Sequence, residues 1–93
     1  MNTYLVTIYG KGGHGAEPHE AIDATVIASE FVRKTTKYKN IKIISVKSGD
    51  AFNVISGKAE INLKVDDINL LEQLITSLLI YYGNQTNYKI EKL

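Results

Sequence analysis

The sequence predicts an α+β domain whose elements follow in the order strand, helix, strand, strand, helix, strand. Three observations support this order: short runs of β-branched and aromatic residues bounded by glycine, two longer stretches with apolar residues at helical spacing, and one stretch of strict apolar and polar alternation. The chain has 93 residues, which is the size of one domain with a modest core. We therefore interpret residues 1–93 as a single domain.

Four segments are typical of strands. The first is rich in β-branched and aromatic side chains, the second contains several β-branched ones, and the last is short. In the third, Ile61, Leu63 and Val65 alternate with polar residues, which indicates one buried face and one solvated face. The four segments are 4–9, 40–47, 58–66 and a final strand that includes Tyr88, Ile90 and Lys92.

The first predicted helix runs from about His19 to Lys37. Pro18 favours a helix start because its backbone angle suits the first turn, with an N-cap near Glu17. Its apolar residues form a set wider than one helical stripe, and small alanines separate the large side chains. This width predicts that two sides of the helix are covered.

The second predicted helix covers residues 68–82. Asp67 is suited to be its N-cap, and Gly83 is suited to end it. Apolar residues at three- and four-residue spacing form one stripe. Tyr81, Tyr82 and Tyr88 are interpreted as the edge of the core rather than as a surface for stacking bases.

This element order predicts a ferredoxin-like sandwich, a βαββαβ fold with a four-stranded antiparallel sheet and both helices on one face. Two strand-helix-strand crossovers of the usual hand place the first and last strands side by side, and the second strand at an edge. The two ends of the chain then lie close together. A domain with neighbouring ends is easily inserted into another domain.

The composition excludes several classes of protein. The net charge is +1 and no basic block is present, so no footprint for nucleic acid or an anionic membrane is visible. No apolar run approaches the ~18 residues of a membrane span, and no secretory signal pattern is seen. The absence of cysteine suits a reducing compartment, and we expect a cytoplasmic protein.

The stretch GKGGHG at residues 10–15 formally fits the G-x-G-x-x-G pattern of dinucleotide-binding turns. Its context does not fit, because that turn needs a helix at the third glycine and a parallel sheet. Glu17 would also place a negative charge where phosphate should bind. The alternative is that the glycines expose a histidine: Gly13 and Gly15 leave the imidazole of His14 unshielded. A surface turn with a solvated histidine is the structural alternative.

Two longer stretches extend this second interpretation. GKGGHGAEPHEAIDA, followed by SGDAFNVISGKAEINLKV, resembles the lid or dimerisation domain of the dinuclear zinc aminoacylases and carboxypeptidases. These enzymes form metallopeptidase clan MH, and the resemblance is to its amidohydrolase branch, which includes hippurate hydrolase and the N-acyl-diaminopimelate deacetylases. It covers nearly the whole chain.

The resemblance implies a role for the chain and for three residues. The family's lid domain is inserted into a catalytic domain and pairs two subunits through the edge strand and first helix. By this resemblance His14 reaches the partner subunit's active site and hydrogen-bonds the scissile carbonyl oxygen. Asn53, at the carboxylate end of the substrate, and Gly13 are the implied substrate-binding residues.

Two positions depart from the family pattern. Ser56 stands where the family has proline, and Asp66 stands where it has an arginine that binds the substrate carboxylate. A shifted alignment would bring Lys64 to the arginine position. An acid cannot hold a carboxylate, so this difference bears on the substrate or on the activity of the parent enzyme.

The expected function follows from these points. With two histidines and no cysteine, the chain assembles no convincing metal site, so the chain alone is not expected to be catalytic. The resemblance implies two zinc ions, or a similar divalent metal, in an absent catalytic domain. We expect the dimerisation and substrate-capping domain of a zinc-dependent amidohydrolase or peptidase that acts on N-acyl amino acids or peptides. The alternative is a free-standing ferredoxin-like module that regulates or binds a small molecule.

Overall fold

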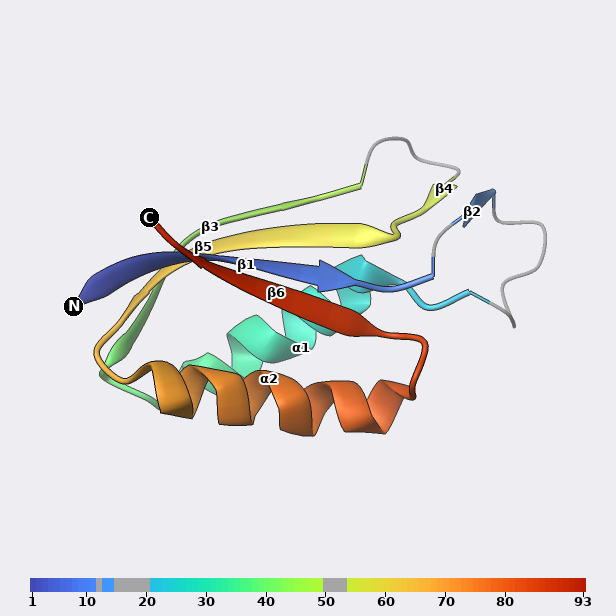
Figure 1. The fold of residues 1–93 in the computed structure, drawn as a ribbon. Helices are drawn as coiled ribbons and strands as arrows, with labels where there is room; N and C mark the ends of the chain where they lie inside the picture. The colour runs from blue at the N-terminus through green and yellow to red at the C-terminus, as the bar shows by residue number, and fades with distance from the viewer. Residues whose placement is uncertain (12, 15–20, 50–53) are drawn as a thin grey trace.

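The computed structural model describes residues 1–11, 13–14, 21–49 and 54–93, and for residues 13, 14, 54 and 55 it describes the backbone alone. Six strands and two helices are assigned in this part of the chain (Figure 1). In chain order they are β1 (Asn2–Tyr9), β2 (Gly13–His14), α1 (Ala24–Thr35), β3 (Ile41–Ser48), β4 (Val54–Ile55), β5 (Lys58–Val65), α2 (Ile68–Tyr82) and β6 (Asn87–Lys92).

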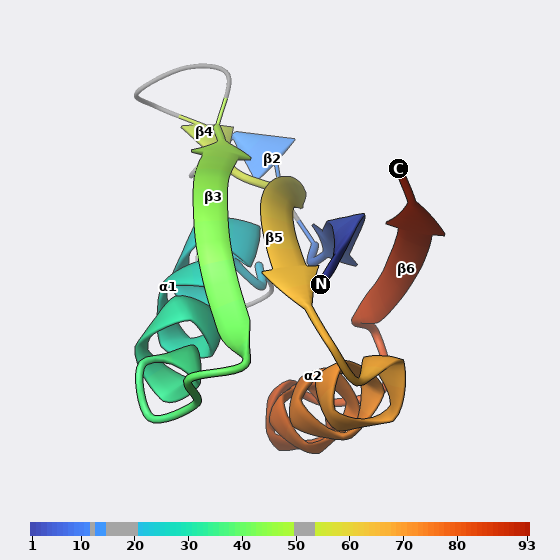
Figure 2. The same ribbon diagram turned by 90° about the vertical axis from the view of Figure 1, so that its left-hand side faces the viewer.

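The four long strands form one antiparallel sheet in the order β3-β5-β1-β6. Both helices lie on the same face of this sheet (Figure 2). The predicted ferredoxin-like sandwich is therefore confirmed, with β3 at an edge and β1 beside β6. The chain ends are neighbours, because the amide of Leu93 donates to the carbonyl of Thr3 at 2.9 Å (Figure 1).

The core lies between the sheet and the helices. The alternation predicted for the third strand is confirmed: its apolar side chains are fully buried, and the polar side chains between them face the open side of the sheet. Phe31 of α1 is the largest fully buried side chain. Its buried neighbours in the core include Val6, Ile8, Ile27, Ile61, Leu63, Val65, Leu71 and Ile75.

Helix α2 has the predicted bounds and caps. The carboxylate of Asp67 accepts a hydrogen bond from the amide of Asn69 at 2.9 Å. Gly83 adopts a positive φ of 98°, and its amide donates to the carbonyl of Leu79 at 3.0 Å. Within the described residues, neither helix is long and apolar enough to cross a membrane.

The tyrosines near the end of α2 divide into two environments. Tyr82 and Tyr88 pack partly buried against the core, as predicted. Tyr81 is 82% exposed, so its interpretation as core edge is wrong. Adjacent helical residues point about 100° apart, and the side that Tyr82 buries leaves Tyr81 in solvent.

Helix α1 begins later than the sequence predicts. It starts at Ala24, and Asp23 is the N-cap whose carboxylate accepts from the amide of Thr25 at 2.8 Å. The predicted start at His19, with Pro18 in the first turn, is wrong for residues 21–23, which are not helical; residues 15–20 lie outside the described residues. Ile22 is extended because it pairs with Lys11 in an antiparallel bridge.

Candidate functional site

The two stretches that carry the family resemblance meet at one end of the domain. No strand is predicted for residues 10–15 or 48–57, yet β2 and β4 pair there as a second, two-stranded antiparallel sheet (Figure 1). Its register places Gly13 opposite Ile55 and His14 opposite Val54. We call these four residues the ribbon. Strands of two residues are too short to show alternation, so the sequence pattern missed them.

The ribbon contains two of the three predicted site residues. His14 and Gly13 are both part of it, and Asn53 immediately precedes Val54, the residue paired with His14. Asn53 itself lies outside the described residues. The pairing therefore places His14 beside β4, the strand that follows Asn53 in the sequence.

Backbone hydrogen bonds tie the base of the ribbon to the segment before α1 and to the segment before β5. Lys11 and Ile22 exchange two bonds, at 2.7 and 2.8 Å. The amide of Gly10 donates to the carbonyl of Gly57 at 2.9 Å. A Cβ atom at Gly10 would clash with the carbonyl oxygen of Ile22, so this close approach requires glycine. The position of the ribbon is thus set mainly by main-chain contacts.

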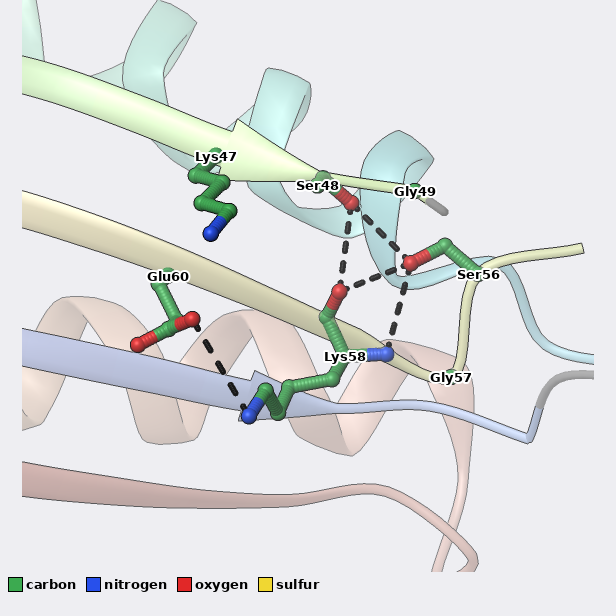
Figure 3. A pocket seen from close by; sticks show the side chains of 7 residues that line it. All are labelled: Lys47, Ser48, Gly49, Ser56, Gly57, Lys58 and Glu60. Carbon is green, nitrogen blue, oxygen red and sulfur yellow. Dashed lines mark hydrogen bonds and ion pairs between the residues drawn. The ribbon is translucent and has the colours of Figure 1, made fainter. Parts of the chain in front are cut away.

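A chain of hydroxyl groups completes the base. The hydroxyl of Ser56 donates to the carbonyl of Lys58 at 2.7 Å and lies 3.1 Å from the hydroxyl of Ser48 (Figure 3). Ser48 in turn lies 2.6 Å from Oγ1 of Thr25, in the first turn of α1. We call Thr25, Ser48 and Ser56 the hydroxyl chain. It joins the start of α1, the end of β3 and the segment after β4.

The hydroxyl chain gives a physical account of one departure from the family pattern. Ser56 is 8% exposed, and its hydroxyl is hydrogen-bonded. Its carbonyl accepts from the amide of Ala24 at 2.8 Å, a contact that proline could also make. Serine thus keeps the backbone contact and adds side-chain bonds that proline lacks.

A hollow of about 320 Å³ lies beside the base of the ribbon (Figure 3). Two lysines and one glutamate contribute its charged groups. Nζ of Lys58 lies 3.9 Å from the carboxylate of Glu60, and Lys47 is directly opposite Glu60 in the sheet. We call this hollow the lysine pocket; it is lined by Lys47, Ser48, Gly49, Ser56, Gly57, Lys58 and Glu60.

The position of the family's arginine lies at the other end of the sheet. Strand β5 starts next to the lysine pocket at Lys58 and ends at Val65, just before Asp66. Eight residues of strand span roughly 25 Å. Asp66 instead lies beside the chain's start, where its carboxylate is 3.4 Å from the amino group of Met1. Lys64 is also near this end, since it pairs with Thr3.

Groups that could bind metal are sparse in the part of the chain described here. No set of three histidine, cysteine, aspartate or glutamate residues is placed to hold a metal ion within it. The side chains of His14 and His19 lie outside this description.

Comparison with known proteins agrees with this architecture. The sequence model of the peptidase dimerisation domain matches residues 1–79. The chain is 43% identical over 67 residues to N-acetyldiaminopimelate deacetylase of Streptococcus thermophilus, which covers 61% of this chain and 18% of the relative. It is 28% identical over 90 residues to hippurate hydrolase of Campylobacter jejuni, covering 86% of this chain and 24% of that protein.

A solved structure has the same fold. The YxeP protein of Bacillus subtilis, described as a dinuclear metal-binding peptidase from the M20 family, superposes with a TM-score of 0.58 at 19% identity. The match covers 98% of this chain and 25% of that protein. The chain thus spans less than a third of the length of each protein compared here. Since the family match extends over most of the sequence, the chain belongs to the peptidase dimerisation domain family of the M20 amidohydrolases and peptidases.

Proposed function

We propose that the chain is the dimerisation and substrate-capping domain of a zinc-dependent amidohydrolase that acts on N-acyl amino acids or peptides. In this proposal His14 enters the active site of the partner subunit. The observation that carries it is the ribbon: the backbone pairs His14 with Val54, and thereby brings together the two segments implied to contact substrate. The family match favours this function over a free-standing regulatory module.

The chemistry proposed for His14 is stabilisation of developing charge. An imidazole N–H directed at the scissile carbonyl oxygen would donate a hydrogen bond that strengthens as the oxygen becomes negative. Loss of one such donor raises the barrier by about 3–4 kcal/mol. The two zinc ions and the general base would belong to a catalytic domain into which this domain is inserted, which suits the adjacent chain ends.

The surface proposed for dimerisation lies at β3 and α1. One side of β3 pairs with β5, while its other side is an edge of the sheet, where a strand of a second subunit could add. Ile44 and Val46 of β3 are 54% and 47% exposed, and Val26 of α1 is 49% exposed. Val46 is paired with the core residue Ile61, so it points to the helical side of the sheet.

The association can be tested on the chain itself by sedimentation. We expect a homodimer, and Val46→Asp should shift it toward monomer because a charge is costly in an apolar interface. Ile80→Asp is the matched control, since Ile80 is 81% exposed on α2 and outside the proposed surface. A monomer at high micromolar concentration, or equal effects of the two changes, would contradict the proposed interface.

The catalytic role is tested in the full-length polypeptide that carries this domain. His14→Ala should lower turnover of an N-acyl amino acid by about 100-fold or more. Mixing this variant with a subunit whose metal site is destroyed should restore part of the activity, because the intact histidine is supplied across the dimer. The isolated chain should show no amidase activity with or without zinc.

Two controls make the result specific. Thr76→Ala, which removes an exposed hydroxyl of α2, should leave turnover unchanged. His14→Ala in the isolated chain should change the free energy of unfolding by less than ~0.5 kcal/mol, as surface substitutions usually do. If His14→Ala unfolds the domain, the glycine-rich segment is structural and the proposed role is wrong.

A further inference from the structure

We propose that the lysine pocket binds the carboxylate group of the substrate, with Lys47 and Lys58 as its cationic residues. This inference rests on the proposed function, because it names the place where an N-acyl amino acid would be held by its acidic end. In the family that the sequence resembles, an arginine binds the substrate carboxylate, and Asp66 stands at its position here; the proposal assigns this task to lysines of β3 and β5.

The pocket is continuous with the ribbon. Ser56 and Gly57 line it and directly follow Ile55, the last residue of β4. Gly57 also accepts the hydrogen bond from Gly10, at the start of the segment that leads to His14. A ligand seated in this hollow would therefore lie next to the base of the ribbon, whereas Asp66 lies at the far end of β5.

The charges in the pocket favour an anion. Lys47 and Lys58 contribute two ammonium groups, and Glu60 is the single acidic residue in the lining. Figure 3 shows the ion pair of Lys58 with Glu60 and the side chain of Lys47 extending from the neighbouring strand. The lining thus carries two positive charges against one negative charge, and this excess attracts a carboxylate to the hollow.

The uncharged residues of the lining offer no free side-chain donor, because the two serines are already hydrogen-bonded and the two glycines have no side chain. The hydroxyls of Ser48 and Ser56 are held in the hydroxyl chain, so recognition of a ligand falls to the lysines. Gly49 has a φ of +86°, and a Cβ there would meet nothing within 4 Å, which leaves this wall open. The volume of about 320 Å³ is at the small end of the range for ligand sites, which suits one amino acid rather than a nucleotide.

The experiment is a titration of the isotope-labelled chain followed by the backbone NMR signals. The probe is N-acetylglycine, and N-acetylglycinamide is its neutral counterpart. We expect N-acetylglycine to shift the signals of Lys47, Gly49, Gly57 and Lys58, and N-acetylglycinamide to leave them in place. Added salt should weaken the binding, because partly exposed charges are screened.

Three variants test how the charged residues affect the dissociation constant of N-acetylglycine. Lys47→Gln should raise the dissociation constant about fivefold, the expected size of one exposed charge contact. Glu60→Gln should lower it, because it removes the competing carboxylate from the pocket. Lys42→Gln is the matched control: Lys42 lies on the same strand but pairs with Lys64, away from the pocket, so its loss should leave the constant unchanged.

The outcomes separate this inference from the proposed function. Equal weakening by Lys47→Gln and Lys42→Gln, equal shifts with the neutral amide, or no shifts at all would overturn the carboxylate site. Tighter binding of inorganic phosphate than of N-acetylglycine would also overturn it, in favour of a phosphate site. None of these results depends on His14, whose role is decided by the activity of mixed dimers.

Discussion

The two ends of this domain are held together by different interactions. Around Phe31, fully buried apolar side chains from the sheet and both helices pack into one core. Around Ser56, the contacts are backbone hydrogen bonds and the hydroxyl chain, and the neighbouring surface is a polar hollow. Apolar packing is insensitive to which ligand is bound, whereas a polar end can present donors and charges to a substrate. The fold thus separates the part that provides stability from the part proposed to provide function.

The largest effect should come from the core. Phe31→Ala removes a fully buried aromatic ring, and should reduce the free energy of unfolding by about 3–5 kcal/mol through lost burial and a residual cavity. Urea denaturation followed by circular dichroism measures this change. A loss below ~1 kcal/mol would show that the core is not the main source of stability and would remove the contrast between the two ends.

A smaller effect is expected at the base of the ribbon, beside the segment that leads into α1. Gly10→Ala places a methyl group against the carbonyl oxygen of Ile22, so the backbone must shift. Overpacking of this kind costs about 1–3 kcal/mol. The shift should also weaken the two bonds between Lys11 and Ile22, and faster amide hydrogen exchange at these residues would report it. Unchanged exchange would show that the segment adjusts without losing these bonds.

The sequence predicted the core end more completely than the ribbon end, for a physical reason. Periodic burial leaves a pattern, so the alternation around Leu63 and the stripe of α2 were sufficient to predict the sandwich. The Lys11–Ile22 bridge leaves no such pattern, because it depends on backbone groups that every residue carries. That bridge is why α1 begins at Ala24 instead of near Pro18.

The candidate site also contains residues that the sequence predicted and residues that it did not. The flanking glycines singled out His14, and the family resemblance added Gly13 and Asn53; the ribbon shows only that His14 is paired with Val54. Their side-chain roles stay predictions. The lysine pocket was not predicted, because Lys47 and Lys58 are separated in sequence and are brought together by the pairing of β3 with β5. The one signal available from the sequence was the missing arginine at Asp66.

The hydroxyl chain offers a finer test of the polar end. Ser56→Ala removes the donor to the carbonyl of Lys58 and a partner of Ser48, and should cost about 1 kcal/mol of stability. Ser29→Ala is the matched control, since the hydroxyl of Ser29 is exposed and bonds only to its own helix. Denaturation of both variants measures the difference. If Ser56→Ala costs no more than Ser29→Ala, the backbone bonds alone hold the ribbon.

The smallest effect concerns Tyr82, in the last turn of α2, and it is seen only in alkaline solution. Burial raises the pKa of the Tyr82 hydroxyl above its usual value of 10.0, with smaller contributions from the charges of Glu30 and Tyr81. The folded state therefore keeps this proton at a pH where the unfolded chain has lost it. Stability should fall as the pH rises through about 10, because the unfolded chain then binds fewer protons than the folded one.

Removing the hydroxyl should remove this part of the pH dependence. Tyr82→Phe should behave like the parent near pH 7 and lose less stability above pH ~10, as measured by urea denaturation across the alkaline range. Glu30→Gln should keep most of the parent's pH dependence, because burial is the main cause of the raised pKa and the charge of Glu30 is secondary. If the two substitutions reduce the pH dependence of stability equally, electrostatic repulsion is instead the main cause of the raised pKa. The partly buried edge of the core would then be governed by charge, as the polar end is, and the contrast between the two ends would not extend to α2.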